Sequence, residues 1–476
     1  MKAILSYSRL PYKDLIRLKK GFDKLNIQIK WITSHNQEQS QASKIFPDAN
    51  QFRWASYRFN ESWLSRFDKD LFDALLGTRK NIALPVVERY GPHEGGSLEA
   101  EMRLMHDFSL AHNMINDAQP DLVIFEKSPE SGIEYCLYLL SKHFGIKTVF
   151  TRKGIFPHSC IFCTDMDTAI LDKNWRPMET IVPVCNLKNP GNELSSLTIQ
   201  KIKEIRKGDQ YSIPDYMRNQ GVSASNQNKL VKFNPKYSLV GFIKGLQKKG
   251  TGDFFKKRLL SYSENLVTSL DRIDWSKKSI FFPLHYQPEA SSMPAGGEYV
   301  NQLKIIKLIS DNLSSGEQLI IKEHPSTFTS AGKTNSNYRN KSFYNWILKM
   351  PNVKLVSVYT RSSYLMDKCI ALVTVSGAAG IEAMIREKPT FVFGNASYLN
   401  GPGIFYIKDE ADFLSALEKI KFKFSYNEVE KFIKSIEGCA YHLNIFPYQT
   451  KNPNETMQIF YVTVLLEGLK VLFGDQ

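Results

Sequence analysis

Three segments of the second half decide the fold: residues 279–289, SIFFPLHYQPE; residues 318–326, QLIIKEHPS; and residues 370–383, IALVTVSGAAGIEA. Each begins as a short apolar run and ends in a polar or glycine-containing turn. That pattern is typical of strands that are buried on both faces of a parallel sheet. We predict strands at 279–285, 318–323, 353–358, 370–375 and 390–393, with helices at 298–313, 338–350, 362–368 and 377–387 between them. The alternation predicts a doubly wound, Rossmann-like domain.

The first half shows the same alternation less cleanly. Strands are predicted at 3–8, 27–33, 121–126 and 146–150, and helices at 13–25, 98–118 and 130–143. Further helices are predicted at 409–420, 426–438 and 454–473. The expected fold class is therefore α/β, with two Rossmann-like domains that have parallel sheets. We expect the first domain over 1–275, with a basic insertion or linker at about 186–258, the second over 276–445, and a terminal helical segment over 446–476.

Length and charge limit the choice of partner. A chain of 476 residues exceeds a single hydrophobic core, and 42% apolar with 23% charged residues excludes global disorder. The net charge of +14 favours an anionic partner. Eight of those charges lie in residues 229–258, where aromatic side chains interleave with lysines. No nucleic-acid-binding motif accompanies the run, so an anionic membrane surface is the favoured partner, with a solvated linker as the alternative.

The N-terminal sequence lacks the apolar core of a secretory signal. No stretch reaches the ~18 uncharged apolar residues of a membrane-spanning helix. We therefore expect a cytoplasmic protein, with any membrane contact peripheral.

Polar clusters follow the strands at 279–285, 318–323 and 370–375. Ligands of open α/β sheets bind at the carboxyl ends of the strands, so these clusters should converge on one site. A histidine such as His324 can donate to a phosphate, and Ser376-Gly377 is expected at a helix start, where free N–H groups attract anions. The bland alternatives are a helix N-cap for Ser376 and a simple turn for His324-Pro325. The nucleotide-site residues that we predict are Lys322, His324, Pro325, Ser376, Gly377, Glu382, Gln287 and Glu289.

The segments FFPLHYQPEASSMPAGGEYVNQL (281–303), IIKEHPS (320–326) and VSGAAGIEA (375–383) resemble the bacterial capsule polysaccharide biosynthesis glycosyltransferases. These include the Kdo transferases and share their HP and S motifs with some bacterial sialyltransferases. The resemblance implies a GT-B fold, in which two Rossmann-like domains face each other and the last helix crosses back to the first domain. It also implies a CMP-activated 3-deoxy-ulosonic acid as donor, either Kdo or a sialic-type nonulosonic acid, and a surface polysaccharide or lipid-linked glycan as acceptor.

Residue roles follow from the same resemblance. His324 and Ser376 would contact the donor phosphate, and Glu382 the ribose. No metal or other cofactor is expected, because the related enzymes that use CMP donors do not need a metal for departure of the nucleotide.

A carboxylate is expected near the reacting carbon, as base or nucleophile. Candidates in the first domain are Glu130 and Glu126, in IFEKSPESGIEY (124–135), and Glu94, in PHEGG (92–96). Arg152 and Lys153, which are expected just past a strand, are candidates for pairing with a substrate carboxylate; a general basic rim is the alternative.

Two short motifs compete with this interpretation. Cys160 and Cys163 form a CxxC, but no second pair lies nearby, so packing cysteines are favoured over zinc or redox chemistry. Asp165 and Asp167 form a DxD, the metal-binding motif of another glycosyltransferase class, which stands here without the further pattern of that class. Two other functions stay open: a UDP-sugar 2-epimerase-like enzyme and a catalytically inactive capsule assembly adaptor.

Overall fold

The computed structural model describes residues 1–7, 10–34, 39–53, 66–79, 82–84, 86–87, 97–156, 159–182, 194–208, 251–289, 291–328, 338–442 and 453–474. The chain forms two compact units. Unit 1 comprises Met1–Leu197 and Phe432–Gln476, and unit 2 comprises Thr198–Lys431.

Unit 1 is built on a seven-stranded sheet with the order β13-β6-β5-β4-β1-β2-β3. The five strands from β5 to β3 are parallel, whereas β6 pairs antiparallel with both β5 and β13. The predicted parallel sheet thus gains an antiparallel edge. Its strands are β1 (Lys2–Ser6), β2 (Gln28–Ser34), β3 (Asn50–Arg53), β4 (Leu122–Phe125), β5 (Lys147–Lys153), β6 (Ser159–Cys163) and β13 (Tyr441–His442).

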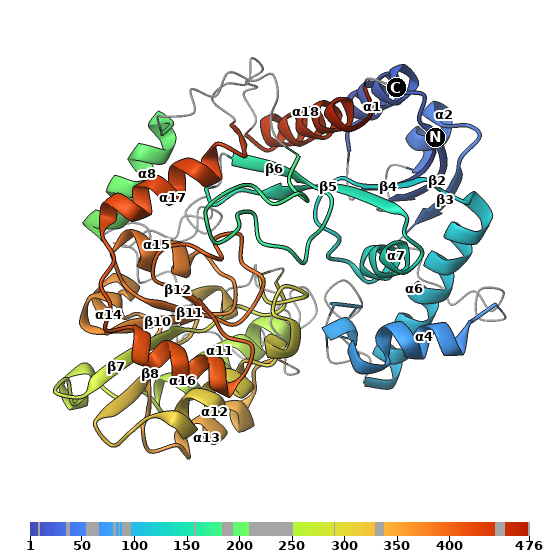
Figure 1. Cartoon of the computed structure of the whole chain (residues 1–476). Coiled ribbons are helices and arrows are strands. Elements are labelled where there is room, and N and C mark those ends of the chain that lie inside the picture. Colours follow the sequence, from blue (N-terminus) through green and yellow to red (C-terminus); the bar gives the residue numbers. More distant parts are fainter. Residues whose placement is uncertain are drawn as a thin grey trace, which may run out of the picture. The chain divides into compact units, whose positions relative to one another are not determined.

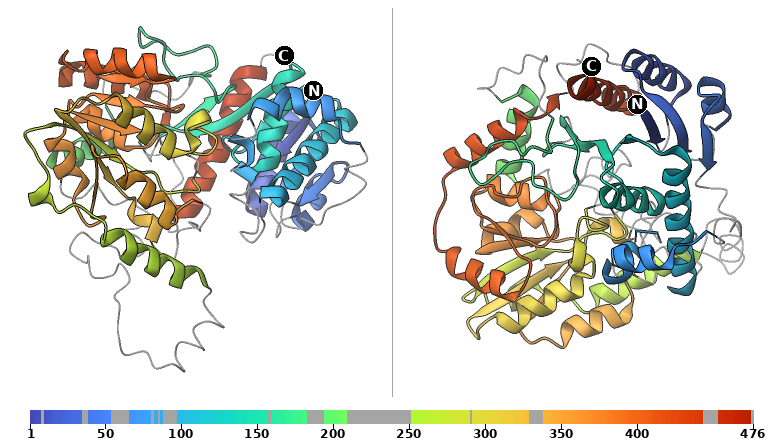
Figure 2. Two further views of the ribbon diagram at one scale, coloured as in Figure 1. Left: turned by 90° about the horizontal axis from the view of Figure 1, so that it is seen from below. Right: turned by 45° about the vertical axis from the view of Figure 1, so that its right-hand side comes forward.

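Helices cover both faces of this sheet (Figure 1). Helices α1 and α18 lie on one face, and α6 and α7 lie on the other. Apolar residues of α1 such as Leu18 and Phe22 pack with Leu465 and Leu469 of α18 in one buried cluster. The start of β1 and the end of α18 therefore lie close together (Figure 2). The helices of unit 1 are α1 (Tyr12–Lys24), α2 (Gln39–Ile45), α4 (Lys69–Leu76), η1 (Gly77–Arg79), α6 (Ser97–Ala118), α7 (Gly132–His143) and α18 (Pro453–Phe473).

Unit 2 contains a fully parallel six-stranded sheet with the order β12-β11-β10-β7-β8-β9. Five of these strands match the predicted ones. The sixth, β12, was not predicted, because a three-residue strand is too short to give a periodic signal. The strands are β7 (Lys278–Pro283), β8 (Glu317–Lys322), β9 (Val353–Val356), β10 (Ala371–Thr374), β11 (Thr390–Val392) and β12 (Ile404–Tyr406).

The two faces of the unit 2 sheet bury separate apolar clusters. Residues of α11, α12, α13 and α16 pack on one face, and those of α14 and α15 on the other. The helices are α8 (Ser196–Lys207) and α17 (Tyr426–Glu437) at the unit boundaries, and α11 (Thr251–Glu264), η3 (Leu270–Arg272), η4 (Gly297–Val300), α12 (Gln302–Asn312), η5 (Pro325–Phe328), α13 (Lys341–Leu348), α14 (Ser362–Lys368), α15 (Ala379–Ile385) and α16 (Glu410–Lys419).

These sheets confirm the predicted fold class of two Rossmann-like α/β domains. Unit 2 begins earlier in the chain than the expected 276, because Leu259 and Leu260 of α11 belong to its apolar core. The chain returns to unit 1 at Phe432, so that α18 packs there.

The basic run of 229–258 is described only from residue 251, and residues 229–250 lie outside the described part of the chain. Within α11, Lys256 is buried, at 6% exposure. Its charge is therefore not presented on a surface, which corrects the expectation that this lysine contributes to a membrane patch. Of the polar segment at 186–228, residues 194–208 are described, and they contain α8 at the unit boundary.

Candidate functional site

The candidate site lies in unit 2, where the direction of winding reverses. The chain runs from β7 to β8 and β9 on one side, and from β10 to β11 and β12 on the other side of β7. Ligands of open parallel sheets bind at this switch point, outside the carboxyl ends of the strands. Here that point lies between the ends of β7 and β10, which are hydrogen-bonded neighbours.

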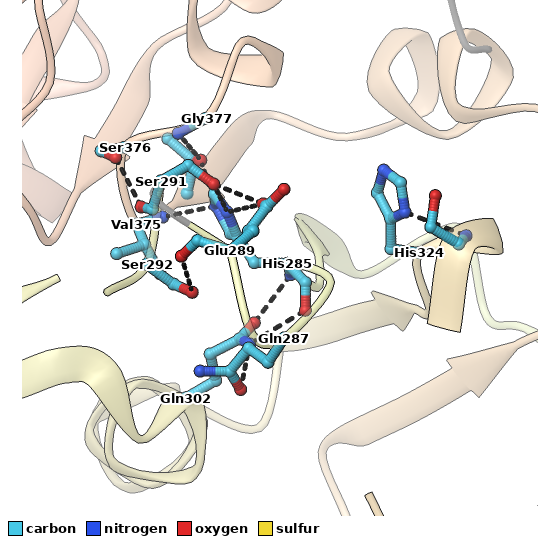
Figure 3. Close-up of polar contacts among 12 residues, drawn as sticks. His285, Gln287, Glu289, Ser291, Ser292, Gln302, His324, Val375, Ser376 and Gly377 are labelled. Atoms are coloured by element: carbon cyan, nitrogen blue, oxygen red, sulfur yellow. Dashed lines mark hydrogen bonds and ion pairs between the residues drawn. The ribbon is translucent and has the colours of Figure 1, made fainter. Parts of the chain in front are cut away.

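His285 joins these two strand ends. Its Nε2 accepts a hydrogen bond from the backbone N–H of Val375 at 3.1 Å and lies 2.9 Å from Thr374 Oγ1. A nitrogen that accepts an N–H cannot carry the proton, so the neutral ring is protonated on Nδ1. Nδ1 faces Glu289 Oε1 at 3.3 Å and Ser291 Oγ at 3.2 Å (Figure 3).

Glu289 is held in its ionised form by this arrangement. Burial alone would raise the pKa of its carboxyl group. The hydrogen bond from His285, with a smaller contribution from the Ser291 hydroxyl, instead holds the pKa below its usual value. The structure thus places a carboxylate at the end of β7.

Ser376 and Gly377 follow β10, but they do not open the helix as predicted. Helix α15 begins at Ala379, and its N-cap residue, Ala378, makes no side-chain capping bond. The Ser376 hydroxyl donates instead to the backbone oxygen of Ser291 at 2.5 Å. The N-cap alternative for Ser376 is therefore wrong: this side chain ties the loop after β7 to the end of β10.

Gly377 is required by packing within the unit. A Cβ atom at this position would lie 2.6 Å from Cε1 of His285. Its backbone N–H donates to Thr374 Oγ1 at 3.1 Å, and its oxygen accepts from the Tyr398 hydroxyl at 2.6 Å. The absence of a side chain at Gly377 thus leaves room for the His285 ring against the end of β10.

His324 follows β8 and stands apart from the His285 network in Figure 3. Its Nδ1 accepts the backbone N–H of Ser326 at 3.1 Å, so Nε2 carries the proton of the neutral ring. Burial lowers the pKa of His324 to about 4, with Glu289 opposing the shift. The partly buried ring is therefore an uncharged donor at neutral pH, and Pro325 begins the short helix η5 that places the Ser326 N–H.

Lys322 and Glu382 form a second pair of ionisable groups. Lys322 is buried and donates to Ser362 Oγ at 3.1 Å. Burial lowers its pKa to about 8, although Glu323 and Glu382 oppose the shift. Burial also raises the pKa of Glu382 to about 8, against the charges of Arg386 and Lys322. Glu382 is therefore largely protonated at neutral pH.

Gln287 is buried, at 5% exposure, and its amide is held on several sides. Its Nε2 donates to the Val300 oxygen at 2.8 Å, and its Oε1 accepts from Gln302 and from Arg339. The structure therefore gives Gln287 a supporting place beneath the loop, not the exposed position expected of a residue that faces a nucleotide.

The predicted carboxylates of unit 1 lie in different settings. Glu126 follows β4 and is buried, and Glu130 is partly exposed before α7; Glu94 lies outside the described residues. A buried carboxyl group that we did not predict is Glu134, which accepts from Ser6 Oγ at 3.0 Å and from the Ser131 N–H at 3.2 Å. Burial raises its pKa. The capping-box spacing of Ser131 and Glu134 was the sequence signal for it.

Arg152 and Lys153 lie inside β5, not past its end, because pairing with β6 extends the strand. Arg152 Nη1 donates to the Thr168 oxygen at 3.3 Å, and Lys153 is exposed.

The competing motifs have structural partners. Cys160 and Cys163 are free and buried in β6, and burial raises both thiol pKa values. Asp165 accepts from the Tyr138 hydroxyl at 3.0 Å and pairs with Lys142. Within the described residues, no group of three or more His, Cys, Asp or Glu side chains is arranged to hold a metal ion. None of the described helices combines the length and apolar character needed to cross a membrane.

Residues 255–441 match the family model of the capsule polysaccharide biosynthesis proteins. The matched segment is less than half of the chain, and it contains β7, β8 and β10 with all of their strand-end residues. The match confirms the predicted resemblance over this segment. No curated protein matches the chain significantly.

Several solved structures show a distant likeness. The UDP-GlcNAc 2-epimerase of Methanocaldococcus jannaschii is 12% identical, over 92% of this chain and 99% of that one, with a TM-score of 0.24. The UDP-GlcNAc 2-epimerase of Neisseria meningitidis is 13% identical, over 98% and 100%, with a TM-score of 0.23. KpsC of Thermosulfurimonas dismutans, a beta-Kdo 2,4 transferase, is 12% identical, over 83% and 96%, with a TM-score of 0.32. TM-scores this low carry no argument about activity.

Proposed function

We propose that the protein is a glycosyltransferase of capsule polysaccharide biosynthesis that transfers a 3-deoxy-ulosonic acid from a CMP-activated donor to a surface polysaccharide or glycolipid. The observation that carries this proposal is the set of polar groups at the β7–β10 switch point, within the segment that matches the capsule family. The expected cytoplasmic location and the absence of a metal requirement stay predictions.

The donor phosphate would lie between His324 and Lys322. The His324 ring is neutral at pH 7, because its pKa is about 4, and its Nε2–H can donate a hydrogen bond to the phosphate. Lys322 supplies positive charge, because with a pKa of about 8 it is mostly protonated at pH 7. Ser376 already donates to Ser291, so its hydroxyl can donate to a phosphate only by exchanging that bond.

The two carboxyl groups of the site differ in protonation, which suits different tasks. Glu382, with a pKa of about 8, can both donate to and accept from the ribose hydroxyls. Glu289 is ionised and accepts only, so it suits a hydroxyl or amino group of the donor and repels the phosphate. These assignments separate the sugar-facing groups from the phosphate-facing groups.

Cleavage of the bond between the sugar and CMP leaves an oxocarbenium-like centre, and the bond to the acceptor hydroxyl then forms at the same carbon. A carboxylate stabilises such a centre or takes the hydroxyl proton. Glu126 and Glu130 are our candidates in unit 1. Glu126 is buried directly after β4, at the switch point between β1 and β4 of that sheet.

Calorimetry with CMP, UDP, GDP and ADP tests the proposal on wild type, His324→Ala and the exposed-histidine control His143→Ala. We expect CMP to bind most tightly, His324→Ala to weaken it, and His143→Ala to leave it unchanged. With a CMP-ulosonic acid donor, His324→Ala should lower kcat/KM at least ~10²-fold, the loss typical of one transition-state donor. A preference for UDP would overturn the CMP donor in favour of an epimerase-like enzyme. Binding of none of the four nucleotides would favour the inactive adaptor.

A further inference from the structure

Arg339 is a fully buried arginine that belongs to none of the predicted site residues. It is 1% exposed and is the largest of the fully buried side chains in the described part of the chain. A guanidinium group keeps its charge at any pH that a folded protein meets, so it must find partners inside the protein.

The three guanidinium nitrogens of Arg339 donate hydrogen bonds to residues that follow two different strands, β8 and β7. Nε donates to Glu323 Oε1 at 2.6 Å, at the end of β8. Nη2 donates to the His285 backbone oxygen at 3.1 Å, and Nη1 donates to Gln287 Oε1 at 3.2 Å, both in the loop after β7. The guanidinium also lies over the Phe343 ring, 4.3 Å from its centroid.

Each of the two segments that Arg339 contacts contains a residue of the proposed site. Glu323 directly precedes His324, and its carboxylate also accepts from the Tyr344 hydroxyl at 3.1 Å. Gln287 lies two residues before Glu289 in the loop that His285 begins. The planar guanidinium group of Arg339 thus links the loop that contains His324 to the loop that contains Glu289 and holds the two loops at a fixed separation.

Stability alone does not account for such a pair. Replacing a buried ion pair by apolar residues of similar volume often leaves a protein equally stable or more so. A guanidinium group presents several N–H donors in a fixed planar arrangement, which the ammonium group of a lysine cannot reproduce. We propose that Arg339 is a positioning residue that sets the spacing of His324, which faces the phosphate, and Glu289, which faces the sugar, around the bound donor. This inference rests on the proposed function.

The test uses the full-length protein with ¹⁵N-labelled histidine. Arg339→Lys keeps the charge and removes the planar arrangement of N–H donors. The double variant Glu323→Met/Arg339→Met replaces the pair by apolar side chains, and Arg272→Lys is the exposed-arginine control in the same unit. His324→Gln assigns the His324 ring signals. In wild type these should show a protonated Nε2 and an accepting Nδ1, as the Ser326 contact requires. Urea unfolding reports stability separately.

We expect both Arg339 variants to lose the fixed tautomer signals of His324, even where the double variant unfolds at the wild-type urea concentration. We also expect their kcat/KM to fall about 10- to 10²-fold, the scale of a small misplacement in a site. Arg272→Lys should match wild type. Wild-type His324 signals in a stable double variant would overturn the proposal, because Arg339 would then be structural only. Changed His324 signals in a protein that binds no CMP would instead uphold the positioning and reject the proposed function.

Discussion

At the scale of single residues, the ionisable groups of the site differ in protonation state at neutral pH. Glu289 is held ionised by His285, whereas Glu382 keeps its proton and His324 stays uncharged because both are desolvated. Separated protonation states of neighbouring groups are typical of functional sites, where burial and hydrogen bonds are arranged against each other. Each of these shifts has a measurable consequence for folding.

Glu382 predicts a pH dependence of stability with a definite sign. Its folded-state pKa of about 8 exceeds the ordinary value of 4.5, so the folded protein holds a proton that the unfolded chain releases. The resulting stability is complete below pH 4.5 and is lost as the pH rises towards 8. Relative to Glu382→Gln, wild type should lose up to about 1.4 kcal/mol of unfolding free energy per pH unit in that window.

Urea unfolding at pH 5, 6, 7 and 8 checks this dependence. The exposed Glu418→Gln serves as the matched control and should keep the wild-type slope. Parallel slopes for wild type and Glu382→Gln would show that Glu382 is solvated and ionised throughout. Lys322 does not interfere, because its lowered pKa of about 8 changes stability above that pH.

The sequence carried enough information to place His324, Ser376 and Glu382 in one region, because the ends of parallel strands meet at one sheet edge. It did not reveal that Gln287 is buried or that Arg339 supports both loops. Those facts depend on side-chain contacts between residues 52 positions apart, and no periodic pattern encodes them. Glu134 was predictable in principle, since its capping box is local.

At the scale of elements, the loop after β10 packs against the His285 ring, which lies on the loop after β7. Gly377→Ala would place a methyl group 2.6 Å from His285 Cε1 and push the ring from the Val375 N–H. Overpacking of this kind costs about 1–3 kcal/mol. We expect that loss in the free energy of urea unfolding, together with weaker CMP binding.

Gly316→Ala is the matched control for this prediction. A Cβ at Gly316 meets one side-chain atom, Ser314 Oγ, at 4.0 Å, so this variant should be as stable as wild type. If Gly377→Ala equals Gly316→Ala in stability and in CMP binding, the His285 ring is free to move and does not fix the two strand ends.

Elements with a clear apolar pattern were predictable, and the very short strand β12 and the antiparallel strands were not. Helix α14 (Ser362–Lys368) has its predicted bounds, because an amphipathic run there is enclosed by two strands. Strands β6 and β13 were missed, since an antiparallel edge depends on pairing between Tyr441 and Cys160, far apart in sequence. The start of α15 was placed two residues early, because a Ser-Gly pair is typical of a helix start but here serves the contact with Ser291.

At the scale of the whole molecule, unit 1 is completed by the end of the chain. Helix α18 supplies Phe460, Leu465 and Leu469 to the apolar cluster that includes α1 and the strands. A bulkier residue at Gly21 would collide with Leu466, which shows how closely α1 and α18 pack. The proposed donor site, in contrast, is built wholly from unit 2.

Because the donor site and α18 belong to different units, we predict that a substitution in the buried face of α18 lowers the stability of unit 1 but leaves nucleotide binding unchanged. Leu469 is 0% exposed, and Leu469→Ala should destabilise unit 1 by about 2–5 kcal/mol through lost burial and the cavity left behind. Val471→Ala, on the same helix at 37% exposure, should stay within about 0.5 kcal/mol of wild type.

Hydrogen exchange should therefore quicken in β1, β4 and β5 of Leu469→Ala but not in β7, β8 or β10. Because the donor site belongs to unit 2, CMP affinity below the unfolding transition should match wild type. A parallel loss of CMP binding and of unit 2 protection would mean that the chain unfolds as one cooperative body and that α18 supports the donor site as well.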